Sequence, residues 1–365
     1  MELMIISGNN IFIYHNKIYN FMEYPRSLAK NHEPFNPIEL SEETQKIVIN
    51  GNKRKYNLFR LEPFYGQIAT ARGVGCNLRC NFCWINPSRD YPEDYGSFYS
   101  PEEVHNKLIE ISSNEYGRAI MSRTARISGC EPTLGIDHLF SLIEICKKED
   151  GFKRFLLETN GILLGYDKTI VKNLNKFENY LLVRLSFKAG TPKSFEKKTG
   201  AKAEYFDLPF RALEYLIEYK IPYSLAAMSQ DPRIMPPEER RSLLKRIIDY
   251  SIENIDLLEE EKTDPFGITK TRLIKGGLVN STTEIRKKVY EPIIHSIKGA
   301  VEVNRRSEMS YEELIELGLK EEELKDLFET MEFKTLESPC IACTRKNHWH
   351  GHNINDDLDD KLNKF

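Results

Sequence analysis

Between about residues 63 and 260, short apolar runs alternate with amphipathic stretches, and this alternation limits the fold more than any other feature. The predicted strands are "YGQIATAR", "TARISG", "RFLLETNG", "YLLVRLSF" and "IPYSLAAMS", with "NIDLLEEE" as a candidate sixth. Helical stretches such as "DHLFSLIEIC", "LPFRALEYLIEY" and "PPEERRSLLKRIIDYSI" lie between or after them. Repeated strand–helix units favour a parallel sheet. We therefore predict an α/β fold, a partial (β/α)6 TIM-like barrel of parallel strands.

The chain divides into three predicted parts. Residues 1–62 form an N-terminal extension with short strands, including "QKIVINGNKRKYNLFRL", broken by proline and Asn-Gly turns. Residues 63–260 form the barrel, and residues 261–365 form a mostly helical C-terminal region that ends in a Cys/His cluster. With 365 residues, of which 40% are hydrophobic, the chain is long enough to bury a large core.

Composition narrows the cellular setting. The net charge of −3 argues against a broadly basic protein that coats nucleic acid, so a nucleic-acid partner is not favoured. The first residues have no basic region followed by a long apolar run, and no segment reaches the roughly 18 apolar residues of a transmembrane helix. Five of the seven cysteines fall in two tight clusters, which suits metal binding in a reducing compartment. We expect a soluble cytoplasmic protein with no membrane partner.

Each predicted strand ends in polar residues. The first is followed by the cysteine loop, and the next four end in "SGCEP", "ETNG", "SFKAG" and "MSQD". In a parallel barrel, the carboxyl ends of the strands meet at one edge, where chemistry is usually placed. The sequence therefore predicts a functional site at that edge.

The cysteine loop, "GVGCNLRCNFCW" at residues 73–84, has the spacing C-x3-C-x2-C. Cys76, Cys80 and Cys83 supply three thiolates, which can hold three corners of an iron–sulfur cubane and leave one iron for another ligand. A structural zinc site is the alternative, but it needs a fourth ligand, and the next histidine is His105, a full helix away.

This loop resembles the signature of the radical S-adenosylmethionine (radical SAM) enzymes, in which the residue before the third cysteine is aromatic. Here Phe82 occupies that position. The resemblance implies that the three cysteines ligate a [4Fe–4S] cluster whose open iron binds SAM. It further implies reductive cleavage of SAM to a 5′-deoxyadenosyl radical, which abstracts hydrogen from a substrate.

The resemblance also extends to the other strand ends. The "SGCEP" turn resembles the family's Gly-Gly-Glu-Pro turn, although Cys130 replaces one glycine, and "ETNG" resembles the activase-like and MoaA-like branches. Glu131 has a second interpretation, as the cap of the helix that begins near Leu134. The resemblance implies that the following residues contact SAM or its surroundings: Phe82, Ser128, Gly129, Glu131, Thr159, Asn160, Ser186, Lys188 and Ser229.

The C-terminal sequence "CIACTRKNHWHGH" contains a second candidate metal site. Cys340, Cys343, His348 and His352 have plausible zinc-ligand spacing. A zinc clip, a second iron–sulfur cluster, and a tail that supplies a catalytic thiol or histidine are the three alternatives. Cys146, by contrast, lies on an apolar stripe and is predicted to be a core residue.

Several functions stay open. A protein or peptide, a nucleoside in tRNA and a small metabolite compete as substrate, and an anaerobic reaction fed by ferredoxin or flavodoxin is expected. A non-catalytic iron–sulfur or zinc protein, serving electron transfer, metal sensing or RNA binding, is the alternative of a different class.

Overall fold

The computed structural model describes residues 11–14, 17–20, 24–62, 68–112, 124–149, 151–177, 179–229, 231, 233–255, 257–261 and 267–279. Its strands are β1 (Ile11–Tyr14), β2 (Lys17–Asn20), β3 (Ile49–Asn50), β4 (Lys53–Glu62), β5 (Ile68–Gly73), β6 (Ser97–Tyr99), β7 (Thr124–Ser128), β8 (Arg154–Thr159), β9 (Leu181–Phe187), β10 (Tyr223–Ala227) and β11 (Leu258–Glu260). Its helices are α1 (Pro37–Val48), α2 (Pro101–Ser112), α3 (Ile136–Lys148), α4 (Ile162–Tyr166), α5 (Lys168–Leu174), α6 (Pro192–Thr199), α7 (Leu208–Glu218), α8 (Pro237–Ile248) and α9 (Gly267–Lys275).

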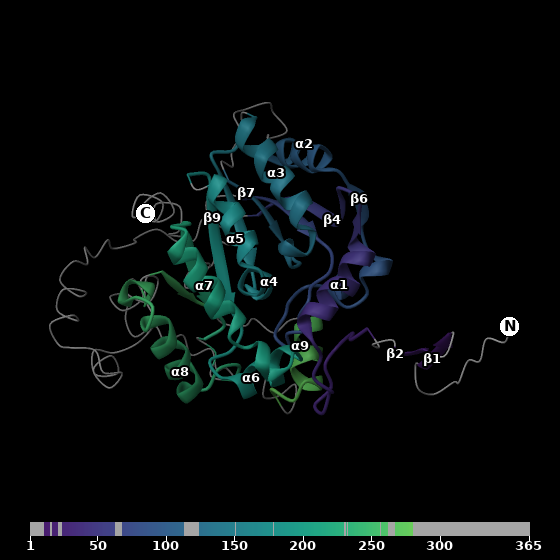
Figure 1. Cartoon of the computed structure of the whole chain (residues 1–365), viewed down its shortest axis with the longest axis vertical. Coiled ribbons are helices and arrows are strands. Elements are labelled where there is room, and N and C mark those ends of the chain that lie inside the picture. Colours follow the sequence, from purple (N-terminus) through teal and green to yellow (C-terminus); the bar gives the residue numbers. More distant parts are fainter. Residues whose placement is uncertain are drawn as a thin grey trace.

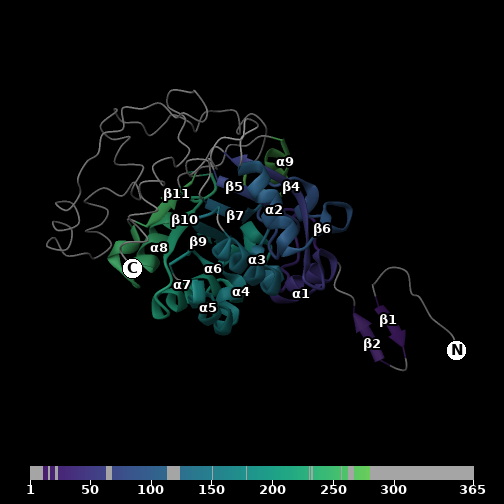
Figure 2. The same cartoon turned by 90° about the horizontal axis from the view of Figure 1, so that it is seen from above.

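The main sheet contains the six predicted strands. Its order is β11-β10-β9-β8-β7-β5-β4-β3, and every pairing from β5 to β11 is parallel. Figure 2 shows these strands as an arc, with α3, α5 and α7 along its outer side. All five residues of β7 and of β10 are buried, as parallel strands covered on both faces require. The partial (β/α)6 barrel predicted from the sequence is therefore confirmed.

Helix α2 begins with a capping box. The Glu103 backbone N–H donates to Ser100 Oγ at 3.2 Å, and the Ser100 N–H donates to Glu103 Oε2 at 2.6 Å. Pro101 occupies the first turn, where its missing N–H costs no hydrogen bond. The helix thereby starts at a fixed point after the cysteine loop and packs against α3.

The N-terminal extension differs from its prediction at α1 (Figure 1). The prediction that Gln45–Val48 begin a strand is wrong, because these residues are the last turn of this helix. Asn36 caps the helix by accepting from the Ile38 and Glu39 N–H groups, and Pro37 follows at the first position.

Strand β4 of this extension joins the barrel sheet, pairing antiparallel with β5. The hairpin of β1 and β2 is a separate antiparallel pair. The division of the whole chain into three parts stays a prediction. None of the helices in the described ranges is long and apolar enough to cross a membrane.

Candidate functional site

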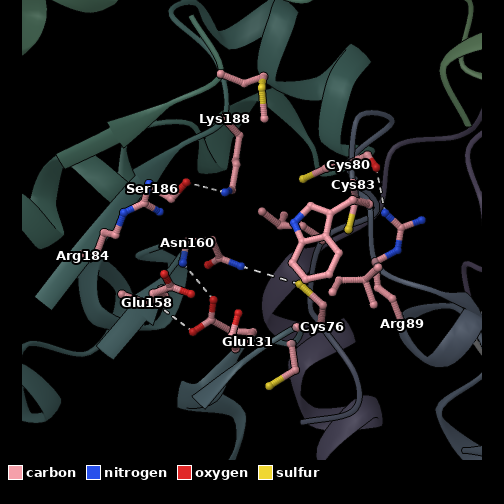
Figure 3. Close-up of a pocket in the computed structure, with 18 of the residues that line it drawn as sticks. Cys76, Cys80, Cys83, Arg89, Glu131, Glu158, Asn160, Arg184, Ser186 and Lys188 are labelled. Carbon is pink, nitrogen blue, oxygen red and sulfur yellow. Dashed lines mark hydrogen bonds between the residues drawn. The ribbon is translucent and has the colours of Figure 1, made fainter. Parts of the chain in front are cut away.

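A cavity of about 550 Å³ lies at the carboxyl ends of β7, β8 and β9. Its size falls within the range of typical small-ligand pockets. Figure 3 shows the cysteine loop on one side and strand-end residues on the other. The lining includes all three loop cysteines and eight of the nine residues predicted to contact SAM or its surroundings: Phe82, Ser128, Gly129, Glu131, Thr159, Asn160, Ser186 and Lys188.

The three cysteines are largely enclosed. Cys80 is buried, and Cys76 and Cys83 are half-buried. Burial, helped by the charge of Glu131, raises the pKa of Cys76 to about 12. Burial also raises the pKa of Cys80, and the ammonium group of Lys188 partly offsets that rise. Without a metal, the side chains of Cys76 and Cys80 are neutral thiols, so binding iron must release their protons.

Backbone and side-chain bonds fix the cysteine loop against the strand ends. The Glu131 N–H donates to the Gly75 carbonyl at 3.0 Å, and Asn160 Nδ2 donates to Asn77 Oδ1 at 2.7 Å. Asn160 Nδ2 also lies 3.9 Å from Cys76 Sγ. Gly75 has a φ of +85°, and a Cβ there would lie 2.7 Å from Thr44 Cγ2 of α1. The loop therefore requires glycine at this position, both for its backbone and for its packing.

Glu131 connects two strand ends through a fully bonded carboxylate that is 1% exposed. Its Oε1 accepts from Thr133 N at 3.2 Å, Thr133 Oγ1 at 2.7 Å and Thr159 Oγ1 at 2.7 Å. Its Oε2 accepts from the Asn160 backbone N–H at 2.8 Å. The structure thus bears out the capping interpretation, since Glu131 caps the short 3-10 helix Pro132–Gly135. The bonds that Glu131 accepts from Thr159 and Asn160 also hold the "ETNG" turn beside the "SGCEP" turn.

An arginine that carries no signal in the sequence supports the "SGCEP" turn. Arg54 of β4 is fully buried and donates to the carbonyls of Glu131 at 2.8 Å and Pro132 at 3.0 Å. Its Nη2 also donates to Cys130 Sγ at 3.2 Å. Cys130 therefore fills a gap between this guanidinium group and Gly73, where an added Cβ would lie 2.4 Å from its sulfur.

The ends of β9 and β10 differ in what they contribute. Lys188 Nζ donates to Ser186 Oγ at 2.6 Å, and both residues line the cavity (Figure 3). Ser229 does not appear among the lining residues. It is 2% exposed, and its hydroxyl donates to Glu260 Oε1 at 2.6 Å.

Paired charges cover the strand side of the cavity. Arg126 of β7 lies 2.8 Å from Glu158 of β8, and Arg184 of β9 bonds Glu259 at 2.7 Å and Glu261 at 2.8 Å. Burial would raise the pKa of Glu158, but Arg126 and Arg184 outweigh it and hold that pKa below its usual value. The wall therefore presents fixed positive and negative charges side by side.

The C-terminal candidate metal site, Cys340, Cys343, His348 and His352, lies outside the described residues. Within the described ranges, no group of three or more His, Cys, Asp or Glu side chains is gathered to hold a single metal ion. Cys146 is fully buried in the core, as predicted.

Comparison with known proteins identifies the class. Residues 71–229 match the sequence model of the Radical SAM superfamily, a stretch that spans the cysteine loop and every strand end described above. Residues 71–229 are thus a radical SAM domain, and this superfamily supports an enzyme of SAM-dependent radical chemistry. The superfamily implies a [4Fe–4S] cluster and SAM as cofactors. No curated protein matches the chain.

Three solved structures are similar over parts of their length. TYW1 with a bound lysine-pyruvate adduct is 20% identical, with a TM-score of 0.36, over 54% of this chain and 72% of that one. The cobalamin-dependent enzyme OxsB is 13% identical, with a TM-score of 0.35, over 60% of this chain and 30% of that one. Streptococcus suis SuiB bound to SAM is 18% identical, with a TM-score of 0.31, over 60% and 53%. This chain thus spans less than two thirds of OxsB and of SuiB.

The residues present fit the cofactors that the superfamily implies. Three thiols from one loop open into one cavity, and cysteine thiolate is the usual ligand of iron–sulfur clusters. The same cavity contains the ammonium group of Lys188, the hydroxyl of Ser186 and the backbone of Gly129, which has a φ of +77°. A Cβ at Gly129 would lie 2.5 Å from Arg72 Cγ, so a side chain there would crowd the cavity wall.

Proposed function

We propose that this protein uses a [4Fe–4S] cluster, held by Cys76, Cys80 and Cys83, to cleave SAM reductively. The observation that carries the proposal is that these three thiols line one cavity with the strand ends of β7, β8 and β9. When bound, the cluster would supply the electron that releases the 5′-deoxyadenosyl radical, and this radical would abstract hydrogen from the substrate.

The chain's own residues then have separate tasks. Lys188 and Ser186 would bind polar groups of SAM, since their ammonium and hydroxyl groups supply donors beside the loop. At the end of β7, Gly129 leaves room in the cavity because it has no side chain, and Ser128 supplies a hydroxyl. Glu131, Thr159 and Asn160 orient the loop rather than react, because their mutual bonds occupy them. Phe82 fills the wall beside Cys83 and is 6% exposed.

The charged wall favours a polar substrate over an apolar one. A ligand that displaces water from Arg126, Glu158 and Arg184 must replace the lost hydrogen bonds with groups of its own. An apolar ligand cannot do this. Ferredoxin or flavodoxin is the proposed source of the electron.

Anaerobic reconstitution with iron and sulfide, followed by calorimetry with SAM, tests the proposal. We expect about four irons and four sulfides per barrel site and saturable SAM binding. Lys188→Met should weaken SAM binding about tenfold while leaving the iron content unchanged, because it removes one charged donor. A protein that assembles the cluster but does not bind SAM would instead be a non-catalytic iron–sulfur protein. Counting metals in a variant truncated after residue 337 distinguishes metal bound at the C-terminal Cys/His cluster from metal bound at the cysteine loop.

A further inference from the structure

Each cysteine of the loop has its backbone carbonyl bonded by a different arginine. Arg79 Nη1 donates to the Cys76 carbonyl at 2.7 Å. Arg89 Nη1 donates to the Cys80 carbonyl at 2.7 Å (Figure 3). Arg272 Nη1 donates to the Cys83 carbonyl at 2.8 Å. Arg79 belongs to the loop itself, Arg89 follows it in the chain and Arg272 lies on α9, and together their bonds fix the backbone at every candidate ligand.

The three guanidinium groups gather on one carboxylate. Asp90 lies 2.7 Å from Arg89, 2.5 Å from Arg272 and 3.9 Å from Arg79. All four residues are buried, with no more than 3% of any of them exposed. We name this group, Arg79, Arg89, Arg272 and Asp90, the arginine clamp.

The arginine clamp carries a surplus of two positive charges behind the cysteine loop. Isolated buried charge is costly unless an opposite charge lies near. Arg79 Nη2 and Arg272 Nε, moreover, have no hydrogen-bond partner among the residues that the structure describes. An iron–sulfur cluster held by the three thiolates would carry negative charge, and it would balance this surplus.

Arg272 comes from outside the barrel strands. It lies on α9 and also bonds the Ile85 carbonyl, while Thr269 of the same helix donates to the Cys83 carbonyl at 3.3 Å. Helix α9, which follows β11 in the chain, therefore holds the cysteine loop at Cys83. The positive charge of Arg272 can therefore be removed by substitution without changing the cysteines themselves.

We propose that the arginine clamp sets the reduction potential of the cluster and holds the loop ready to receive it. This inference rests on the proposed function for the cluster itself. Adding an electron makes the cluster more negative, so nearby positive charge stabilises the reduced state and raises the potential. Asp90 opposes this effect. Removing one arginine and removing Asp90 should therefore shift the potential in opposite directions.

A redox titration of the reconstituted protein, followed by electron paramagnetic resonance, tests the electrostatic part. In Arg272→Gln, the ratio of reduced to oxidised cluster at a fixed potential should fall about tenfold, which is about 59 mV for one electron. In Asp90→Asn the ratio should rise by a similar factor, and in Arg272→Lys, which keeps the charge, it should change far less. Lys275→Gln, on the same helix but exposed, is the matched control and should change nothing.

Hydrogen exchange of the metal-free protein tests the holding part without any cluster. Amides of residues 76–86 should exchange faster in Arg272→Gln than in the wild type or in Lys275→Gln. Equal exchange would overturn the clamp as a support of the loop. Potentials that do not move, or that move the same way in Arg272→Gln and Asp90→Asn, would overturn its electrostatic role. A wild-type protein that takes up no cluster would instead count against the proposed function, while the exchange result would still decide the clamp.

Discussion

Replacing Cys80 by alanine is expected to abolish SAM cleavage. Cys80 is the most enclosed of the three loop thiols, and two remaining thiolates cannot hold a cubane with one open iron. The variant should contain well under one cluster per chain after anaerobic reconstitution. Visible absorption and iron analysis measure the loss of the cluster. Chromatography of the nucleoside products measures the loss of SAM cleavage.

Cys146→Ala is the matched control, because Cys146 is a fully buried thiol of α3 that lies outside the cavity lining. It should keep the full iron content and the cleavage activity, with at most a modest loss of stability. Cleavage that survives in Cys80→Ala, or iron lost equally in both variants, would contradict the assignment of the loop.

Glu131→Gln should destabilise the protein by about 3 kcal/mol and weaken assembly of the site. The buried carboxylate accepts four hydrogen bonds with two oxygens. A glutamine has one oxygen, so its NH₂ group must face either the Asn160 N–H or the donors of Thr133 and Thr159. At least one buried donor is then left without an acceptor. Urea unfolding of the metal-free protein measures the change.

The exposed Glu110 of α2 provides the control for this charge-neutralising change. Glu110→Gln removes only a surface ion pair with Lys107, and it should leave the midpoint of unfolding unchanged. If Glu131→Gln were as stable as Glu110→Gln, the carboxylate would not be the connection between the two turns that the geometry indicates.

The barrel and the cysteine loop could be predicted because their signals are local in the sequence. Strand–helix alternation identifies β5, β7, β8, β9, β10 and β11, and the short C-x3-C-x2-C spacing identifies the loop. Helix α1 was missed because the β-branched run at residues 47–49 resembles a strand. The capping by Asn36 and Pro37 would have indicated the helix instead.

The supporting residues of the site could not be predicted, because their partners are distant in sequence. Arg272 lies 189 positions from Cys83, and Arg54 lies 77 positions from Glu131. Single arginines carry no periodic or spacing signal, so only the fold shows what they bond. Ser229 illustrates the opposite case, since its strand-end position suggested the cavity, whereas Glu260 of the neighbouring β11 accepts its hydroxyl.

Release of 5′-deoxyadenosine from SAM is the measurement that tests the central claim most directly. The anaerobically reconstituted wild-type protein is mixed with SAM and dithionite, and the nucleoside products are separated. We predict 5′-deoxyadenosine in amounts that depend on both the cluster and dithionite, and none from the Cys80→Ala variant. A fully loaded wild-type protein that releases none would contradict the assignment of this cavity as a site of SAM cleavage.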